Sequence, residues 1–270
     1  MTIKIGIGSC VVGQPVRFNG DKKRRNPFIA ELAGHAELVP LCPEVAIGLG
    51  VPRKPVRLVK SAGDVRLMDS DTQTLDHTDA MRAYADEQAP LLKGLAGYIG
   101  VKGSPSCGLE RVKSYTIKGN VAEADGQGVF IQRLRQQNPL LPIEEDGRLN
   151  DAILRERFIC QVFVYAAWQQ WREQAPSFSR LQAFWVRHKY LVMARHYPRY
   201  KALGRLLGNH DDLPLGDVTE QFITGLMDAL KHSATRRGNT NAMQHIRGYR
   251  KNQLSREQKA DIDTSIEDYR

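Results

Sequence analysis

The chain has 270 residues, of which 41% are hydrophobic and 26% charged, proportions typical of a globular protein with a buried core rather than of a disordered one. No apolar run approaches the roughly 20 residues that a membrane span needs, and the first residues lack the pattern of a secretory signal, so we expect a cytoplasmic protein with no membrane segment. The net charge of +9 is unevenly divided: residues 1–150 carry 20 basic and 17 acidic side chains (+3), and residues 151–270 carry 19 and 13 (+6). A basic second half favours a polyanionic partner such as nucleic acid.

The first half of the chain alternates strand and helix patterns. Apolar runs at 3–7, 36–41 and 95–101 predict strands. A helix is expected over 26–33, with Pro27 in its first turn, and a longer one over 74–89, ending before Pro90. This order predicts a mostly parallel, Rossmann-like sheet covered by helices on both faces.

Helix patterns dominate the rest of the chain. Residues 126–135 predict a loop and a helix, 138–143 a short strand, and 144–147 a turn. Asn150 is the expected N-cap of a helix over 151–172, whose apolar face comprises Leu154, Phe158, Val162, Tyr165 and Trp168. Further helices are expected over 179–194, 199–207, 217–232, 240–252 and 256–269, the last with a capping box formed by Ser255 and Gln258. We therefore predict an α/β domain over 1–150 and an all-α domain over 151–270.

Three of the four cysteines follow predicted strands. Cys10, Cys42 and Cys107 lie in glycine- or proline-flanked loops, whereas Cys160 lies within a predicted helix and is expected to pack in the core. Ligands of open parallel sheets sit at the carboxyl ends of the strands, so the first three thiols can converge there. Three thiolates and an open position suit either a catalytic zinc or an iron–sulfur cluster; the alternatives are cysteines that only pack in the core and a single catalytic thiol.

Polar residues accompany these cysteines. Glu44 lies two residues after Cys42, where it could move protons or only cap the following helix. Ser104 and Ser106 flank Cys107, and their hydroxyls could bind the carbonyl of a heterocycle or only shape the loop.

Three segments that carry these residues, GSCVVGQPVRFNG, PLCPEVAIGLGVPR and KGSPSCG, together resemble the thiouracil desulfidase family over about residues 1–150. The resemblance implies a compact α/β fold and a [4Fe-4S] cluster on Cys10, Cys42 and Cys107, with one iron free to bind the sulfur of the substrate. It also implies a non-redox reaction in which water replaces that sulfur, Glu44 acts as acid and base, and Ser104 positions the substrate.

The segment RHKYLVMARHYPRYKALGRLLGN is similar to the signature of a helical domain often fused to this desulfidase domain. The fused form resembles enzymes that remove sulfur from 4-thiouridine in tRNA. That helical domain usually continues past a segment like IEDYR, whereas this chain stops at Arg270, so either the sequence is cut there or this member is short.

Two basic segments are candidate RNA contacts. Residues 180–205 interleave cations with aromatic residues, a composition suited to phosphates and splayed bases; a solvated helix face is the alternative. Lys22, Lys23, Arg24 and Arg25 form a second group about a dozen residues after Cys10, where they could grip phosphates beside an extruded base or simply face solvent. The candidate contacts in the helical half are Arg187, Lys189, Arg195, Arg199 and Lys201.

The sequence thus favours desulfuration of 4-thiouridine to uridine in tRNA, with release of hydrosulfide. Three alternatives stay open: the same chemistry on free thiouracil or the nucleoside, a non-catalytic iron–sulfur protein that binds RNA or acts as a sensor, and a zinc hydrolase.

Overall fold

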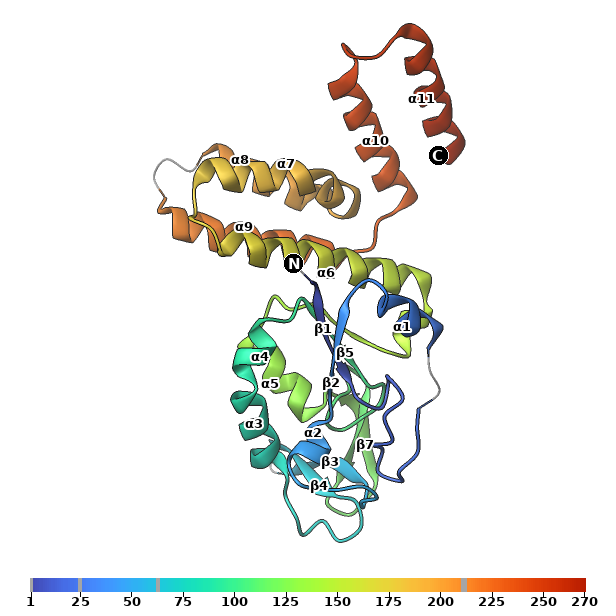
Figure 1. Ribbon diagram of the computed structural model, residues 1–270, viewed down its shortest axis with the longest axis vertical. Helices are drawn as coiled ribbons and strands as arrows, with labels where there is room; N and C mark the ends of the chain where they lie inside the picture. The colour runs from blue at the N-terminus through green and yellow to red at the C-terminus, as the bar shows by residue number, and fades with distance from the viewer. Residues whose placement is uncertain (1, 24–25, 62–63, 210–212) are drawn as a thin grey trace. The chain divides into compact units, whose positions relative to one another are not determined.

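The computed structural model describes residues 2–23, 26–61, 64–209 and 213–270, and the chain divides into two compact units, Met1–Ala166 and Ala167–Arg270 (Figure 1). The division falls inside the long helix α6 (Ala152–Arg172), later in the chain than the boundary expected at residue 150.

A parallel sheet forms the centre of the first unit. Its strand order is β2-β1-β5-β8, and each neighbouring pair runs parallel. This arrangement confirms the predicted fold class of a parallel-sheet α/β region followed by helices. The four strands are β1 (Lys4–Gly8), β2 (Glu37–Leu41), β5 (Gly97–Gly100) and β8 (Ile143–Glu145).

One face of this sheet packs against α1 (Pro27–Leu32) and the first part of α6. Ile5 and Ile99 point to this face and join Phe158 and Val162 of α6 in one buried core. Asn26 is the N-cap of α1, because its side chain accepts a hydrogen bond from the Phe28 amide at 3.0 Å.

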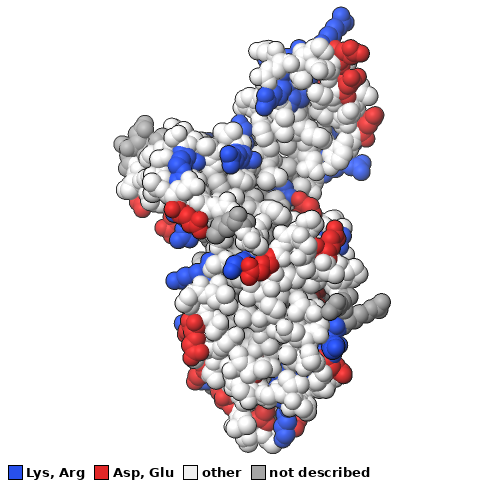
Figure 2. Space-filling view, in the orientation of Figure 1, with Lys and Arg blue, Asp and Glu red and all other residues white. Residues whose placement is uncertain are grey.

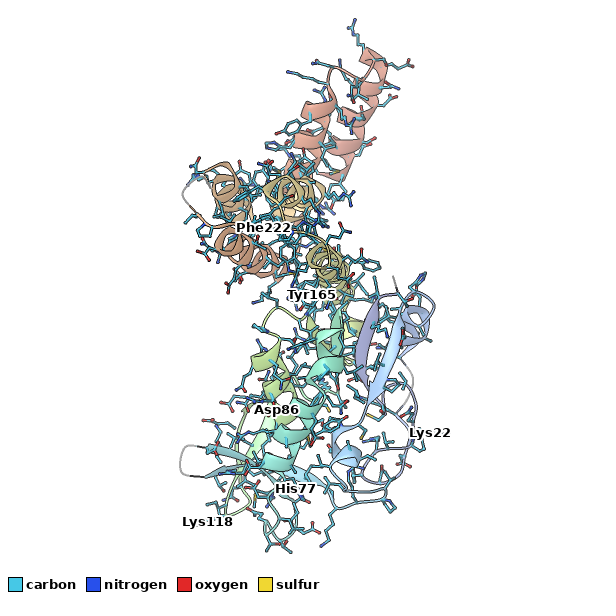
Figure 3. All side chains as sticks on the ribbon, turned by 60° about the vertical axis from the view of Figure 1, so that its left-hand side comes forward. Lys22, His77, Asp86, Lys118, Tyr165 and Phe222 are labelled. Carbon is cyan, nitrogen blue, oxygen red and sulfur yellow. The ribbon has the colours of Figure 1, made fainter. Side chains whose placement is uncertain are left out.

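The opposite face packs against α5 (Val129–Gln137) and α3 (Thr78–Glu87). The Phe130 ring of α5 lies 5.7 Å from the ring of Tyr98 on β5 and 5.9 Å from the ring of Tyr84 on α3. Asp86 of α3, labelled in Figure 3, pairs with Arg133 of α5 through contacts of 2.6 and 3.0 Å. The sheet is therefore covered on both faces, as predicted.

A second sheet was not expected from the sequence. It has the order β4-β3-β6-β7, with parallel pairing between β3 and β6 and antiparallel pairing at its other two junctions. Its strands, such as VRLVKS and DVRLMD, intersperse charged and apolar residues and so resemble solvent-exposed loops. They are β3 (Val56–Ser61), β4 (Asp64–Asp69), β6 (Val112–Thr116) and β7 (Val121–Gly126).

The helix expected over 74–89 is shorter at its start and is followed by another helix. Asp76 forms an isolated bridge with Met68 of β4, and its side chain accepts from the Thr78 amide at 2.9 Å, so the helix α3 begins at Thr78. Pro90 does not terminate the helical segment but lies in the first turn of α4 (Ala89–Lys93), where its missing N–H costs nothing.

Two further expectations before α6 were wrong. β8 contains Glu144 and Glu145, which were expected in a turn, because parallel pairing with β5 places Ile99 beside Glu144. Asn150 belongs to the 3₁₀ helix η1 (Arg148–Asn150). The cap of α6 is Asp151 instead, since its carboxylate accepts from the amides of residues 153 and 154 at 2.8 and 3.0 Å.

The second unit is helical and has an aromatic core. The rings of Phe184 and Phe222 lie 5.4 and 6.2 Å from that of Trp168. The capping box of Ser255 and Gln258 is present as predicted. After the end of α6, the helices are α7 (Phe178–Arg195), α8 (Tyr197–Gly208), α9 (Leu215–Leu230), α10 (Arg236–Arg250) and α11 (Arg256–Tyr269).

Within the described ranges, none of the helices combines the length and the apolar character required to cross a bilayer.

Candidate functional site

The three loop cysteines follow three neighbouring strands of the parallel sheet. Cys42 comes directly after β2, Cys10 comes two residues after β1, and Cys107 lies in the loop that follows β5. Because β2, β1 and β5 are adjacent and parallel, their carboxyl ends share one edge of the sheet. The thiols predicted from the sequence to converge are therefore brought to the same edge.

The loop of Cys107 folds back onto its own strand. The Val101 amide donates to the Cys107 carbonyl at 2.9 Å, and the Gly108 amide donates to the Ser104 carbonyl at 2.8 Å. Gly100 permits this approach, because a Cβ added there would lie 2.4 Å from the Cys107 carbonyl oxygen. Cys107 is only 5% exposed, whereas Cys10 and Cys42 are half-buried.

Burial disfavours the charged form of all three thiols, and neighbouring negative charges add to its effect. Burial raises the pKa of Cys10 and of Cys42, and it raises the pKa of Cys107 well above its ordinary value. The charge of Cys42 raises the pKa of both other thiols further, which shows that the three sulfurs lie within electrostatic reach of one another. Uptake of metal at these positions would be coupled to proton release.

Glu44 stands beside these thiols in the first turn of the short helix α2 (Pro43–Ala46). Its Oε2 accepts from Arg53 Nε at 2.9 Å and Nη2 at 2.5 Å, and its Oε1 accepts from the Ser106 hydroxyl at 2.8 Å. Both side chains of the ion pair are largely shielded, at 15% exposed for Glu44 and 5% for Arg53. The carboxylate is thus fixed in one orientation at the edge where the cysteines meet.

Arg53 was not singled out from the sequence, although it is the last residue of the motif PLCPEVAIGLGVPR. The chain returns it to Glu44 through a loop in which Gly48 and Gly50 have positive φ angles of 88° and 69°. Its third nitrogen donates to the Gly50 carbonyl at 2.9 Å. The conformation of this loop, which the sequence does not show, brings the arginine to face the glutamate.

The two serines flanking Cys107 have different partners. The Ser104 hydroxyl oxygen accepts from the amides of Ser106 and Cys107 at 3.3 and 3.0 Å, so it shapes the loop while its own proton stays available. Ser106 is fully buried and donates to Glu44.

Acidic residues at the end of β8 hold the surroundings of the site. Glu145 accepts from the Leu109 amide at 2.8 Å and so fixes the segment just after Cys107. Asp146 accepts from the Lys102 amide at 3.1 Å and pairs with Lys23 at 2.5 Å. These carboxylates, expected in a turn, hold the loops at this edge of the sheet in place.

The first basic group is only partly described. Lys23 is held by Asp146 near the site, and its charge opposes the effect of burial by lowering the pKa of Cys10. Lys22 is exposed, as its label in Figure 3 shows on the outer side of the loop after β1. Arg24 and Arg25 lie outside the described residues.

The cations of the helical unit have diverse environments. Arg187 and Lys201 are exposed, whereas Arg199 pairs with Asp228 of α9 at 2.8 Å. Lys189 lies over the rings of Tyr190 and Tyr249 at 5.1 and 4.7 Å. Arg195 donates to the carbonyl of residue 191 at 3.4 Å. On the face shown in Figure 2, basic side chains alternate with acidic ones rather than forming one continuous stripe.

Trp185 and Tyr190, which interleave these cations, are partly buried. The Trp185 ring lies 5.6 Å from that of Tyr200 and 6.1 Å from that of Phe222. Cys160 is partly buried and lies within α6 rather than in a loop after a strand. Among the residues that the structure describes, no three His, Cys, Asp or Glu side chains form a ready-made ligand set for a single metal ion.

The fold and the site define an α/β protein with three thiols and a fixed carboxylate at one sheet edge. Residues 5–146, slightly more than half of the chain, match the 2-thiouracil desulfurase family, and the chain belongs to that family. Residues 189–270 match a second family, described as a protein of unknown function, DUF1722.

Two individual relatives are similar to this chain over slightly more than half of its length. The uncharacterized protein YbbK of Bacillus subtilis (strain 168) is 26% identical over 153 residues, which cover 54% of this chain and 98% of YbbK. A solved structure titled [4Fe-4S]-dependent thiouracil desulfidase TudS is 26% identical, with a TM-score of 0.44, and the match covers 55% of this chain and 94% of that one.

The Glu44–Arg53 pair predicts a measurable coupling. Arg53→Ala leaves a shielded carboxylate without its main partner and should lower the free energy of unfolding by roughly 2–3 kcal/mol. In a Glu44→Gln background the same change should cost clearly less, because no charge is then stranded. Urea unfolding of the metal-free wild type, both single variants and the double variant completes this cycle. Simple additivity would show that the two side chains do not stabilise one another.

Proposed function

We propose that the protein removes sulfur from a thiolated uracil without net redox change, using a [4Fe-4S] cluster held by Cys10, Cys42 and Cys107. The observation that carries the proposal is the convergence of these three cysteines at the ends of three adjacent strands, beside the fixed carboxylate of Glu44. Membership in the 2-thiouracil desulfurase family supports the class of substrate.

The donor set fits such a cluster. Three free thiols share one edge of the sheet, and the fourth cysteine, Cys160, belongs to α6. Iron–sulfur clusters are held by cysteine thiolates. Cys107 is buried, so a cluster bound to it would be shielded from solvent on that side. When bound, a cluster with three cysteine ligands supplies an iron with an open position, which can act as a Lewis acid toward the thiocarbonyl sulfur.

The residues of the chain supply proton transfer and orientation. Glu44, held by Arg53 and Ser106, is placed to take a proton from the water that attacks the ring carbon and to return it to the departing hydrosulfide. The Ser104 hydroxyl can donate to a carbonyl oxygen of the base while its oxygen shapes the loop. A carbon–oxygen bond thus replaces the carbon–sulfur bond, and no electrons are gained or lost overall.

The favoured substrate within this class is 4-thiouridine in tRNA. The second half of the chain carries a net charge of +6, and exposed Arg187 and Lys201 are available to phosphates. Lys23 offers a cation beside Cys10, and the exposed Lys22 precedes it in the same loop. Free thiouracil or the nucleoside is the alternative substrate, in which case the helical unit serves another purpose.

We also place the protein in the cytoplasm. Cys10, Cys42 and Cys107 are free thiols, the state that a reducing compartment maintains.

Cysteine replacement tests the cluster. After anaerobic purification and reconstitution, Cys10→Ala, Cys42→Ala and Cys107→Ala should each lose the iron–sulfur absorbance and the conversion of 4-thiouridine to uridine. Cys160→Ala is the matched control and should keep both. Metal analysis of the wild type decides between iron and zinc, and zinc in place of iron would contradict the proposal.

Glu44 separates catalysis from cluster binding. Glu44→Gln should retain the iron and sulfide content of the wild type but lose about 100-fold or more in turnover, because proton transfer is removed. Normal turnover in this variant would remove Glu44 from the mechanism. A wild type that holds the cluster but converts neither tRNA nor free thiouracil would support a structural or sensing role instead.

Salt dependence tests the RNA substrate. The double variant Arg187→Ala/Lys201→Ala should bind tRNA more weakly, and the slope of log K against log salt should become less steep by about 0.7–0.9 for each phosphate that the variant no longer neutralises. Lys118→Ala, in the turn between β6 and β7 and labelled in Figure 3, is the exposed control in the first unit. Turnover of free thiouracil with no binding of tRNA would favour the alternative substrate.

A further inference from the structure

The hydroxyl of Tyr98 is a buried polar group with no use in the mechanism above. Tyr98 lies on β5 and has no exposed surface. Its oxygen has no hydrogen-bond partner of good geometry among the residues that the structure describes. Burying an unpaired polar group costs about 1–3 kcal/mol. Phenylalanine would fill the same space without this cost, so the presence of a hydroxyl at this position needs an explanation.

The geometry of β5 places this phenol alongside Cys107. Side chains alternate along a strand, so Tyr98 and Gly100 belong to the same face of β5. The Cys107 carbonyl packs directly over Gly100, within 2.4 Å of the position of a missing Cβ. The Tyr98 ring also crosses the neighbouring strand at Gly6, where an added Cβ would meet the ring at 2.5 Å.

Electrostatic effects between the two side chains agree with this placement. Burial raises the pKa of Tyr98 well above its ordinary value, and a negative charge on Cys107 is the next largest contribution. In turn, a side-chain hydrogen bond from Tyr98 lowers the pKa of Cys107, against the stronger effects of burial and of Glu44. The hydroxyl therefore faces the sulfur, in a contact that falls short of good hydrogen-bond geometry.

A thiol and a metal-bound thiolate differ greatly as acceptors. A neutral sulfur accepts hydrogen bonds only weakly, whereas a thiolate carries the charge that shortens and strengthens them. Other donors near Cys107 have other uses: Ser106 donates to Glu44, the Leu109 amide donates to Glu145, and the Ser104 proton is assigned above to a carbonyl of the base. The Tyr98 hydroxyl is therefore a donor available to the sulfur of Cys107, the most deeply buried of the three thiols.

We propose that Tyr98 donates a hydrogen bond to the Cys107 sulfur when that sulfur ligates the cluster, and so acts as a positioning residue for this ligand. The inference rests on the proposed function for the identity of the metal group. It goes further in assigning a role to a residue outside the cysteine motifs. Hydrogen bonds to ligand sulfurs contribute to the reduction potential of a cluster, and outer ligand contacts contribute to its retention.

The test is Tyr98→Phe, which removes a single oxygen and preserves the ring. The metal-free variant should unfold at the same temperature as the metal-free wild type or higher, because an unpaired polar atom is gone. The reconstituted variant should release iron to a chelator about 10-fold faster than the wild type without substrate present. Its cluster should also have a more negative reduction potential, since the ligand sulfur loses a donor.

Tyr115→Phe is the matched control. Tyr115 lies on β6 of the other sheet, with its ring 5.1 Å from the Arg57 guanidinium, and its replacement should leave iron release unchanged. Equal iron release and potential in the Tyr98→Phe variant and the wild type would overturn the proposal. So would a loss of stability as large in the metal-free form as in the loaded form, because it would show a packing role.

The same measurements separate this inference from the proposed reaction. A wild type that loads the cluster but fails to desulfurate any thiolated uracil overturns the reaction, while rapid iron release by Tyr98→Phe would still support the role of Tyr98. A wild type that never takes up iron and sulfide overturns both.

Discussion

The pairing of β1 with both β2 and β5 is the constraint on which the site depends. Each strand ends in a loop that carries one cysteine, and parallel pairing in register places these three ends at one edge of the sheet. The cysteines are separated by 32 and 65 positions in the chain, so no local structure could bring them together. Pairing of the strands turns three thiols that are far apart in the sequence into one potential ligand set.

Holding three thiols in a partly buried edge is unfavourable by itself. Burial raises the pKa of all three thiols, neighbouring sulfurs raise those of Cys10 and Cys107 further, and the Tyr98 hydroxyl lacks a hydrogen bond of good geometry among the described residues. The surrounding contacts offset this cost: Gly100 lets the Cys107 loop close tightly, and Glu145 binds the amide of Leu109 just beyond it. A site that stays unfavourable until it binds its ligand is typical of metal centres, where binding free energy stabilises the fold.

The two units contribute different physical properties. The first provides rigid strand ends, a fixed carboxylate and shielded thiols, all suited to chemistry on a small heterocycle. The second provides a helical core built on aromatic residues such as Trp168 and Phe222, and it carries most of the net positive charge. Several of its cations are engaged within the unit, as Arg199 is with Asp228, so charge content alone overstates the surface available to a polyanion.

The sequence by itself determined the parallel strands, the helical second half and the three cysteines, because apolar periodicity and glycine-flanked loops are local patterns. Only the tertiary structure decided the second sheet, whose charged, half-exposed strands resemble loops, and the burial of Glu144 and Glu145 in β8. It also decided that Arg53 faces Glu44. Such ion pairs and strand pairings depend on which segments, distant in the sequence, come into contact in the fold. Local sequence patterns do not specify these contacts.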